Sequence, residues 1–137
     1  MFAQRTGKRL HWYHALDEVS GRHVLNLSLI NRLQSLHSGQ TNSRMGCIPL
    51  VIGMLVMINS NFDVEGGVVN GCAGILRSVC YRKGINGERH AVSCIVDAPG
   101  SSGENLPCLR PHEVVALVDT VDLEFRDNYS GKKCKVK

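Results

Sequence analysis

Residues Ile48–Ile58 read IPLVIGMLVMI, an unbroken apolar run that decides how the centre of this chain folds. The run is too short for a membrane span, which needs about 20 apolar residues. Its β-branched side chains, together with Pro49 and Gly53, argue against a buried helix. We therefore predict a strand that is either buried on both faces or kinked at Gly53.

The run continues into residues Asn59–Leu76, which read NSNFDVEGGVVNGCAGIL. We predict a loop over residues 59–67, a short strand, a turn at Asn70–Gly71 and another strand from Gly74. Asn-Gly between apolar runs is a strong hairpin signal, because both residues tolerate positive φ. The centre of the chain is thus expected to be a compact, strongly bent β unit.

Before this centre, Arg9–Asp17 is a short aromatic stretch with strand character. Its Trp12 and Tyr13 side chains are of a kind that stacks on nucleic-acid bases. Packing on the edge of a core is the more common use of such a pair, and we favour it here.

One segment of the chain has a clear helical period. Apolar residues recur at i, i+1, i+4 and i+7 between Leu25 and His37, which predicts an amphipathic helix. Asn26 or Ser28 is expected to cap its N-terminus. The preceding residues, Glu18–Gly21, have the composition of a turn.

After the centre, Ile75–Arg82 and His90–Asp97 alternate in polarity around a second Asn-Gly pair at Asn86–Gly87. This pattern predicts a second hairpin. Its tip would carry a small basic cluster of Arg82, Lys83 and Arg89.

The C-terminal third is expected to be extended over His112–Phe125, with a bulge or strand end at Asp119. The chain then ends in the basic segment Lys132–Lys137. Two readings of this tail stay open: a binder of phosphates without sequence preference, or a strand whose partner is missing.

The bulk composition is that of a globular protein. The 137 residues suffice for one ordinary domain, or a small domain with appended segments, and 43% are hydrophobic and 20% charged. Sixteen Lys and Arg against 12 Asp and Glu give a net charge of +4. This mild excess is compatible with a polyanionic partner and equally with an ordinary surface.

The cysteines give no metal-site pattern. None of the six forms a C-x-x-C pair, and Cys108-x-x-x-His112 is the only tight Cys/His spacing, so we expect no metal. Met1–Leu10 has no apolar signal-peptide core. We therefore expect an intracellular chain that keeps its thiols reduced. Our further expectations are a nuclear location, a monomeric state and no membrane binding.

No catalytic motif is present in the sequence. It has no G-x-x-x-x-G-K-[ST] phosphate loop, no G-x-G-x-x-G, no H-E-x-x-H and no G-x-S-x-G. The histidines and acids are scattered without a spacing that would pair a nucleophile with a base. We therefore assign no catalytic residue.

The central stretch carries a resemblance to a known family. Residues 49–58 and 67–74 resemble the L-x-x-G-x-x-V-M-L…N…G-L-V-N-G-x-x-G region of Pif-family DNA helicases, in particular the Helitron transposon helicases of fungi. The motif positions are Gly53, Asn70, Gly71 and Gly74. The flanking segments 7–13, 36–42 and 119–125 also resemble Helitron-type proteins, so the resemblance covers almost the whole chain.

The resemblance implies a mainly β fold with one or two helices: a small Src-homology-three-like β-barrel plus a partial RecA-like α/β segment. It divides the chain into a partial motor-domain segment over 1–46, a β-barrel-like domain over 47–126 and a basic tail over 127–137. The barrel would belong to the second motor domain of the parent helicase. Leu55 departs from the family pattern, which usually has Pro there.

The implied function is that of a non-catalytic fragment of an ATP-dependent DNA helicase that handles single-stranded DNA in transposition, recombination or repair. The phosphate loop, the H-K-x-Q-G-type segment and the arginine finger of the family are absent. ATP and Mg²⁺ are therefore implied only for a full-length parent. The candidate nucleic-acid-binding residues are Arg82, Lys83, Arg89, Lys132, Lys133 and Lys135. The alternatives are a free-standing β-barrel that binds protein without nucleic acid, and a small metal-binding protein.

Overall fold

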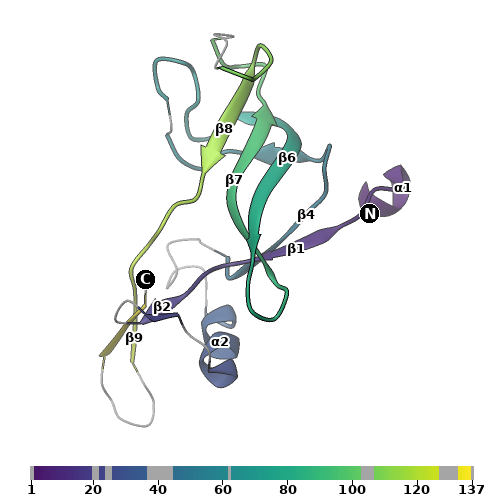
Figure 1. Ribbon diagram of the computed structural model, residues 1–137. Helices are drawn as coiled ribbons and strands as arrows, with labels where there is room; N and C mark the ends of the chain where they lie inside the picture. Colours follow the sequence, from purple (N-terminus) through teal and green to yellow (C-terminus); the bar gives the residue numbers. More distant parts are fainter. Residues whose placement is uncertain are drawn as a thin grey trace. The chain divides into compact units, whose positions relative to one another are not determined.

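The computed structural model describes residues 2–19, 22–23, 26–36, 45–61, 63–102, 107–126 and 133–136. The chain is mainly β with two short helices, as expected (Figure 1). It divides into two compact units, each described by itself below. The first unit comprises Met1–Trp12 and Pro49–Val118, and the second comprises Tyr13–Ile48 and Asp119–Lys137.

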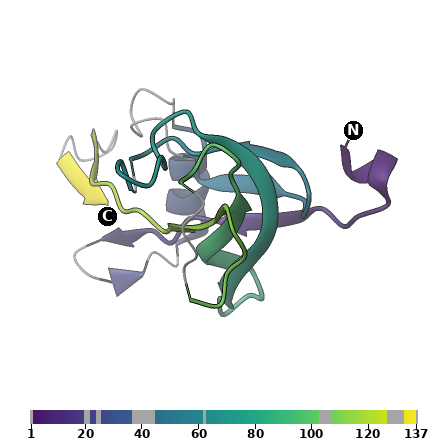
Figure 2. The same cartoon turned by 90° about the horizontal axis from the view of Figure 1, so that it is seen from above.

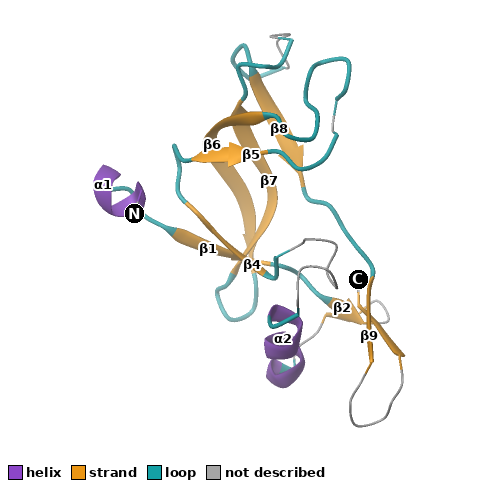
Figure 3. Ribbon diagram, turned by 180° about the vertical axis from the view of Figure 1, so that it is seen from behind, coloured by secondary structure: helices purple, strands orange, loops and turns teal. Residues whose placement is uncertain are grey.

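The elements follow one another along the chain with strands predominating (Figure 3). In order they are α1 (Phe2–Thr6), β1 (His11–His14), β2 (Glu18–Val19), β3 (Arg22–His23), α2 (Leu27–Gln34), β4 (Cys47–Leu50), β5 (Leu55–Met57), β6 (Ala73–Lys83), β7 (Arg89–Asp97), β8 (Glu113–Leu117), β9 (Leu123–Arg126) and β10 (Lys133–Val136). The division between the two units passes through β1 and β4. Among the described residues, no helix is long and apolar enough to cross a membrane.

The largest sheet has six strands in the order β4-β1-β7-β6-β5, with β8 also paired to β7. The pairs β5–β6, β6–β7 and β7–β8 are antiparallel. Within the described residues this sheet is open, whereas the resemblance implied a closed small barrel. The short strand β5 lies at one end of the strand order (Figure 3), and the described residues supply no further strand that would close the sheet.

The predicted second hairpin is present as β6–β7, and its long strands are visibly bent (Figure 1 and Figure 2). The register shifts twice, between Leu76 and Ser78 and between Cys80 and Tyr81. Such bulges bend a strand and increase its twist. The first shift makes Arg77 an extra residue, so the simple alternation expected from the sequence does not continue along the strand.

The core of the first unit lies across β6, β7 and β8. Leu76 and Val96 are each about 1% exposed and lie directly opposite each other, and Val96 lies opposite Val114 on the next strand. Ile58, Val68 and Ala98 complete the cluster. Burying one such aliphatic side chain contributes roughly 1.5–3 kcal/mol to stability. Three successive strands are thus held together by one layer of apolar residues.

The apolar run is interrupted at Gly53, which confirms the predicted kink at this residue. β4 ends at Leu50, Gly53 has a φ of +92°, and β5 begins at Leu55. The kink is fixed by a hydrogen bond of 2.7 Å from Gly53 N–H to Leu76 C=O. The reading as one strand buried on both faces is wrong, because Leu55 and Met57 are 68% and 70% exposed.

The Asn70–Gly71 turn exists, but it does not connect two strands of a hairpin. Cys72 N–H donates to Val69 C=O at 3.0 Å, and Gly71 has a φ of +93° whereas Asn70 does not have a positive φ. Positive φ at the third residue alone is typical of a type II turn, not of the type I′ hairpin turn. The strand that follows, β6, pairs with β5, and Val68 forms only an isolated bridge with Asp63.

The second unit contains the predicted amphipathic helix as α2. The Asn26 side chain accepts hydrogen bonds from the backbone N–H groups of Ser28 and Leu29, so Asn26 is the N-cap rather than Ser28. Leu33 is buried, and Val19, Leu29, Leu36 and Leu123 pack against it. The helix ends at Gln34, and the expected end residues Leu25 and His37 lie outside the described residues.

Two expectations for the second unit are wrong or are decided by the structure, and a third, for the segment that leads into it, is confirmed. Glu18 and Val19 form strand β2, which pairs with β3, so they are not turn residues; Ser20 and Gly21 lie outside the described residues. The basic tail contains β10, which pairs antiparallel with β9. The tail is therefore a strand whose partner is present. His112–Phe125 is extended in two pieces, β8 and β9, and Asp119 lies in the break between them, as expected of a strand end.

Candidate nucleic-acid interface

The tip of the β6–β7 hairpin is a tight loop, Gly84–Glu88. Gly84 N–H donates to Glu88 C=O at 2.9 Å and Gly87 N–H donates to Gly84 C=O at 3.1 Å. Gly87 has a φ of +78°. A turn followed by a glycine in the left-handed region is a common three-residue hairpin loop. It fixes the register of the last strand pairs, and so the positions of the basic side chains beside it.

The register places the three basic residues of the tip on two faces. Lys83 lies directly opposite Arg89, and Arg82 lies opposite His90. Successive residues of a strand point to opposite faces of a sheet. Lys83 and Arg89 therefore share one face, and Arg82 and His90 share the other. The sequence predicted one basic cluster at this tip, whereas the structure divides it.

Tyr81 lies on the face of Lys83 and Arg89. It lies two residues before Lys83 on β6, and its partner Ala91 lies two residues after Arg89 on β7. The Arg89 guanidinium carbon lies 4.5 Å from the centroid of the Tyr81 ring. This is a cation–π contact, which contributes about 0.5–1 kcal/mol at exposed sites. The contact restricts the Arg89 side chain to the region over the ring.

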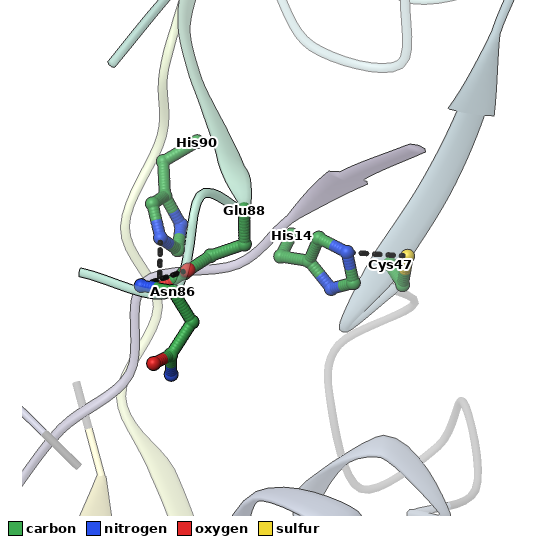
Figure 4. Close-up of polar contacts among 5 residues, drawn as sticks. All are labelled: His14, Cys47, Asn86, Glu88 and His90. Carbon is green, nitrogen blue, oxygen red and sulfur yellow. Dashed lines mark hydrogen bonds and ion pairs between the residues drawn. The ribbon is translucent and has the colours of Figure 1, made fainter. Parts of the chain in front are cut away.

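The other face of the tip carries a carboxylate (Figure 4). One oxygen of Glu88 accepts a hydrogen bond of 2.9 Å from Asn86 N–H, and the other lies 3.4 Å from His90 Nε2. Hydrogen bonds from the Glu88 backbone, from His90 and from Asn86 lower the pKa of the Glu88 carboxyl, although partial desolvation opposes them. The carboxylate is therefore ionised at neutral pH and lies beside the His90 ring.

The basic side chains of the hairpin differ in their partners. Arg77 forms an ion pair with Asp97, the last residue of β7, at the end of the hairpin away from the tip. Among the described residues, none of Arg82, Lys83 and Arg89 has a carboxylate within ion-pair distance. Their charges are thus available to an anion in solution.

The basic residues of the tail belong to the second unit. Lys133 and Lys135 lie on β10, opposite Arg126 and Glu124 of β9. Lys132 lies outside the described residues. The tail and the hairpin tip therefore do not belong to one compact unit.

The motif positions of the resemblance lie where the backbone is constrained. A Cβ on Gly74 would lie 2.5 Å from the backbone oxygen of Asp97 and 2.6 Å from Val96 Cγ1, so only glycine fits there. Gly53 and Gly71 have positive φ, as described above. Asn70 donates its backbone N–H to Asn61 Oδ1 at 2.8 Å. These residues hold the bent β unit together, and their roles are structural.

The aromatic pair of β1 divides between core and surface. Tyr13 is 5% exposed, in agreement with the expectation that it packs in a core. Trp12 is 54% exposed and does not. The two residues point to opposite faces of the strand because they are neighbours in it.

A contact that no sequence pattern indicated joins His14 of β1 and Cys47 of β4, which are 33 residues apart (Figure 4). His14 Nε2 lies 3.9 Å from Cys47 Sγ. Burial raises the pKa of the Cys47 thiol, so the thiol is protonated at neutral pH and is not an activated nucleophile. Among the described residues, no three His, Cys, Asp or Glu side chains converge as metal ligands would.

Comparisons with known proteins leave the chain without an assigned relative. No protein-family model, no curated protein and no solved structure matches it.

Proposed function

We propose that this chain is a non-catalytic segment of a Pif-family, Helitron-like DNA helicase and contacts the backbone of single-stranded DNA through the tip of the β6–β7 hairpin. The observation that carries the proposal is a set of three cations, Arg82, Lys83 and Arg89, on a hydrogen-bonded hairpin without carboxylate partners among the described residues. Phosphates are the anions that such a strand end would meet along a nucleic acid.

The resemblance adds the family and the place of this unit within it. Its motif glycines coincide with backbone positions that need glycine, which supports reading residues 49–74 as a specific bent β unit. We propose that this unit corresponds to the small Src-homology-three-like barrel of the family. The segment with α2 would correspond to part of the RecA-like motor domain.

The proposed contact is electrostatic, so its strength should depend on salt. Binding to single strands weakens with a slope of about −0.7 per neutralised phosphate in a plot of log affinity against log salt. Phosphate contacts by all three cations would give the upper limit, a slope of about −2 and roughly a twentyfold loss of affinity between 50 and 200 mM salt, and contacts by two of them give a slope of about −1.4. Little sequence preference is expected, because phosphates carry no base identity.

Catalysis is not part of the proposal. Phosphoryl transfer needs a phosphate loop around the β- and γ-phosphates, a Mg²⁺-bound carboxylate and an arginine finger. None of the Lys or Arg residues of this chain lies in a phosphate-loop motif. The isolated chain should therefore neither bind ATP specifically nor hydrolyse it.

The test is a fluorescence-anisotropy titration with a labelled single-stranded oligonucleotide at low and at physiological salt, beside an ATPase assay. Salt-sensitive binding without ATP turnover is the expected result. ATP turnover above background would contradict the non-catalytic reading. A complete lack of DNA binding at low salt would contradict the proposed contact.

The second candidate function is a protein-interaction module, and the edge strand β5 favours it. β5 lies at one end of the sheet order and exposes Leu55 and Met57 on one face. An exposed apolar edge strand is suited to receive an added strand from a partner chain. Two results together would favour this candidate over the first. The chain would not bind DNA at low salt, and an added partner peptide would protect the backbone amides of β5 from hydrogen exchange.

A further inference from the structure

We infer that only one face of the hairpin tip, formed by Tyr81, Lys83 and Arg89, receives the phosphodiester backbone of single-stranded nucleic acid, and that Tyr81 positions Arg89 for it. Arg82, on the opposite face, contributes little. The inference rests on the proposed function and names the binding surface within it. The sequence places all three cations together and does not distinguish between them.

Charge is arranged differently on the two faces of the hairpin tip. Lys83 and Arg89 are directly opposite each other in the ladder, and like charges so placed repel. A phosphate between them would relieve that repulsion, so the free protein favours an anion at this position. The face of Arg82 differs, because the Glu88 carboxylate lies beside His90 there and offsets part of the positive charge.

The Arg89 side chain is already ordered by its contact with Tyr81. A free arginine loses much side-chain freedom when it binds a phosphate. The guanidinium of Arg89 is already held over the Tyr81 ring, at 4.5 Å from the centroid. Its planar donors therefore lose less freedom when they contact phosphate oxygens. Tyr81 acts through Arg89 and is a positioning residue.

The decisive experiment compares Lys83→Glu with Arg82→Glu in the full chain. The two residues are neighbours on β6, both are exposed, and both substitutions change the net charge by the same amount. Binding is measured by anisotropy with a labelled oligothymidylate of about 20 nucleotides at low salt. We expect Lys83→Glu to weaken binding about tenfold and Arg82→Glu less than about threefold.

Equal losses for the two variants, while the unchanged chain binds, would overturn the inference and leave the proposed function standing. A larger loss for Arg82→Glu would overturn it in the same way. If the unchanged chain does not bind, the proposed function itself fails. Thermal melting of each variant shows that both are folded under the assay conditions.

The role of Tyr81 is tested by Tyr81→Phe and Tyr81→Leu. Phe keeps the aromatic ring under Arg89 and should retain affinity within about twofold, whereas Leu removes the ring and should weaken binding severalfold. In an Arg89→Gln background the Tyr81→Leu change should have no further effect, because its action passes through Arg89. The positioning role would be contradicted if the Phe and Leu variants bound DNA with equal affinity. It would also be contradicted if Tyr81→Leu weakened binding as much in the Arg89→Gln background as in the unchanged chain.

Discussion

The β6–β7 hairpin uses its side chains differently at its two ends. At the inner end, Leu76 and Val96 face each other in the core, and Arg77 is paired with Asp97. At the tip, the backbone ladder continues in regular register, but Lys83 and Arg89 have no carboxylate partner among the described residues. The ladder fixes the backbone at both ends. Packing and ion pairing engage the inner side chains, whereas those of the tip remain available to a ligand.

The largest effect is expected when a core side chain at the inner end of the hairpin is removed. Leu76→Ala should destabilise the protein by about 2–5 kcal/mol, because it leaves a cavity opposite Val96. Urea unfolding followed by circular dichroism measures the change. Leu117→Ala is the matched control, since Leu117 is largely exposed on β8 and should cost under about 0.5 kcal/mol. Similar losses for the two variants would mean that the core is not centred on β6 and β7.

The next test compares the two Asn-Gly turns. Gly71 and Gly87 both have positive φ and open space where a Cβ would lie, so Val at either is strained without a clash. Gly71 N–H donates to the backbone C=O of the buried Ile58, whereas the Gly87 turn bonds only within its own loop. Gly71→Val should therefore cost more than about 1 kcal/mol of global stability.

Gly87→Val should have a smaller effect on global unfolding, because strain at the tip can be relieved by local fraying. Gly100→Val is the control for the size of the side chain, since Gly100 is exposed, has open space and has no positive φ. Unchanged unfolding midpoints for Gly71→Val would count against the turn. An equal cost at Gly100 would show that φ is not the cause.

A smaller effect separates stability from binding along the hairpin. Arg77→Gln should cost about 0.2–1 kcal/mol of stability, as expected for a partly exposed ion pair, and leave DNA affinity within about twofold. Lys83→Gln should leave stability unchanged or slightly raised, because it removes a like-charge repulsion, and should reduce the salt slope by about 0.7. If Arg77→Gln weakens DNA binding and Lys83→Gln does not, the inner end of the hairpin, and not the tip, contacts the DNA.

The smallest expected effect concerns pH. The pKa of Glu88 is lowered in the folded protein, so its contribution to stability is present above the ordinary glutamate pKa and is lost as pH falls through the folded-state value. The loss should therefore occur in the acid range, below the ordinary glutamate pKa of 4.5. Unfolding free energies of the unchanged chain and of Glu88→Gln between about pH 6 and about pH 3 measure it. Parallel pH profiles for the two proteins would exclude a contribution from this carboxylate.

The sequence predicted much of the local structure correctly. The apolar period and Asn26 predicted α2, Gly53 marked the kink between β4 and β5, and the alternation around Asn86–Gly87 predicted the β6–β7 hairpin. These features depend on neighbouring residues, through helix periodicity, capping and the φ range of glycine. The turn at Asn70–Gly71 was predicted at the right place and Gly71 has a positive φ, but the hairpin expected around it is absent, because distant contacts choose the strand that pairs with β6.

Local sequence was enough to predict helix α2, the kink at Gly53, the β6–β7 hairpin and the cations near its tip, but not helix α1 or the paired strands β2 and β3. The tertiary structure decided which strands pair, that the tail strand β10 joins β9, and that His14 meets Cys47. It also decided that Lys83 and Arg89 share a face from which Arg82 is excluded. Strand register decides these pairings, because a shift of one residue moves every side chain to the other face. At the tip the Gly84–Glu88 loop sets the register, whereas farther along the hairpin the register shifts twice, between Leu76 and Ser78 and between Cys80 and Tyr81.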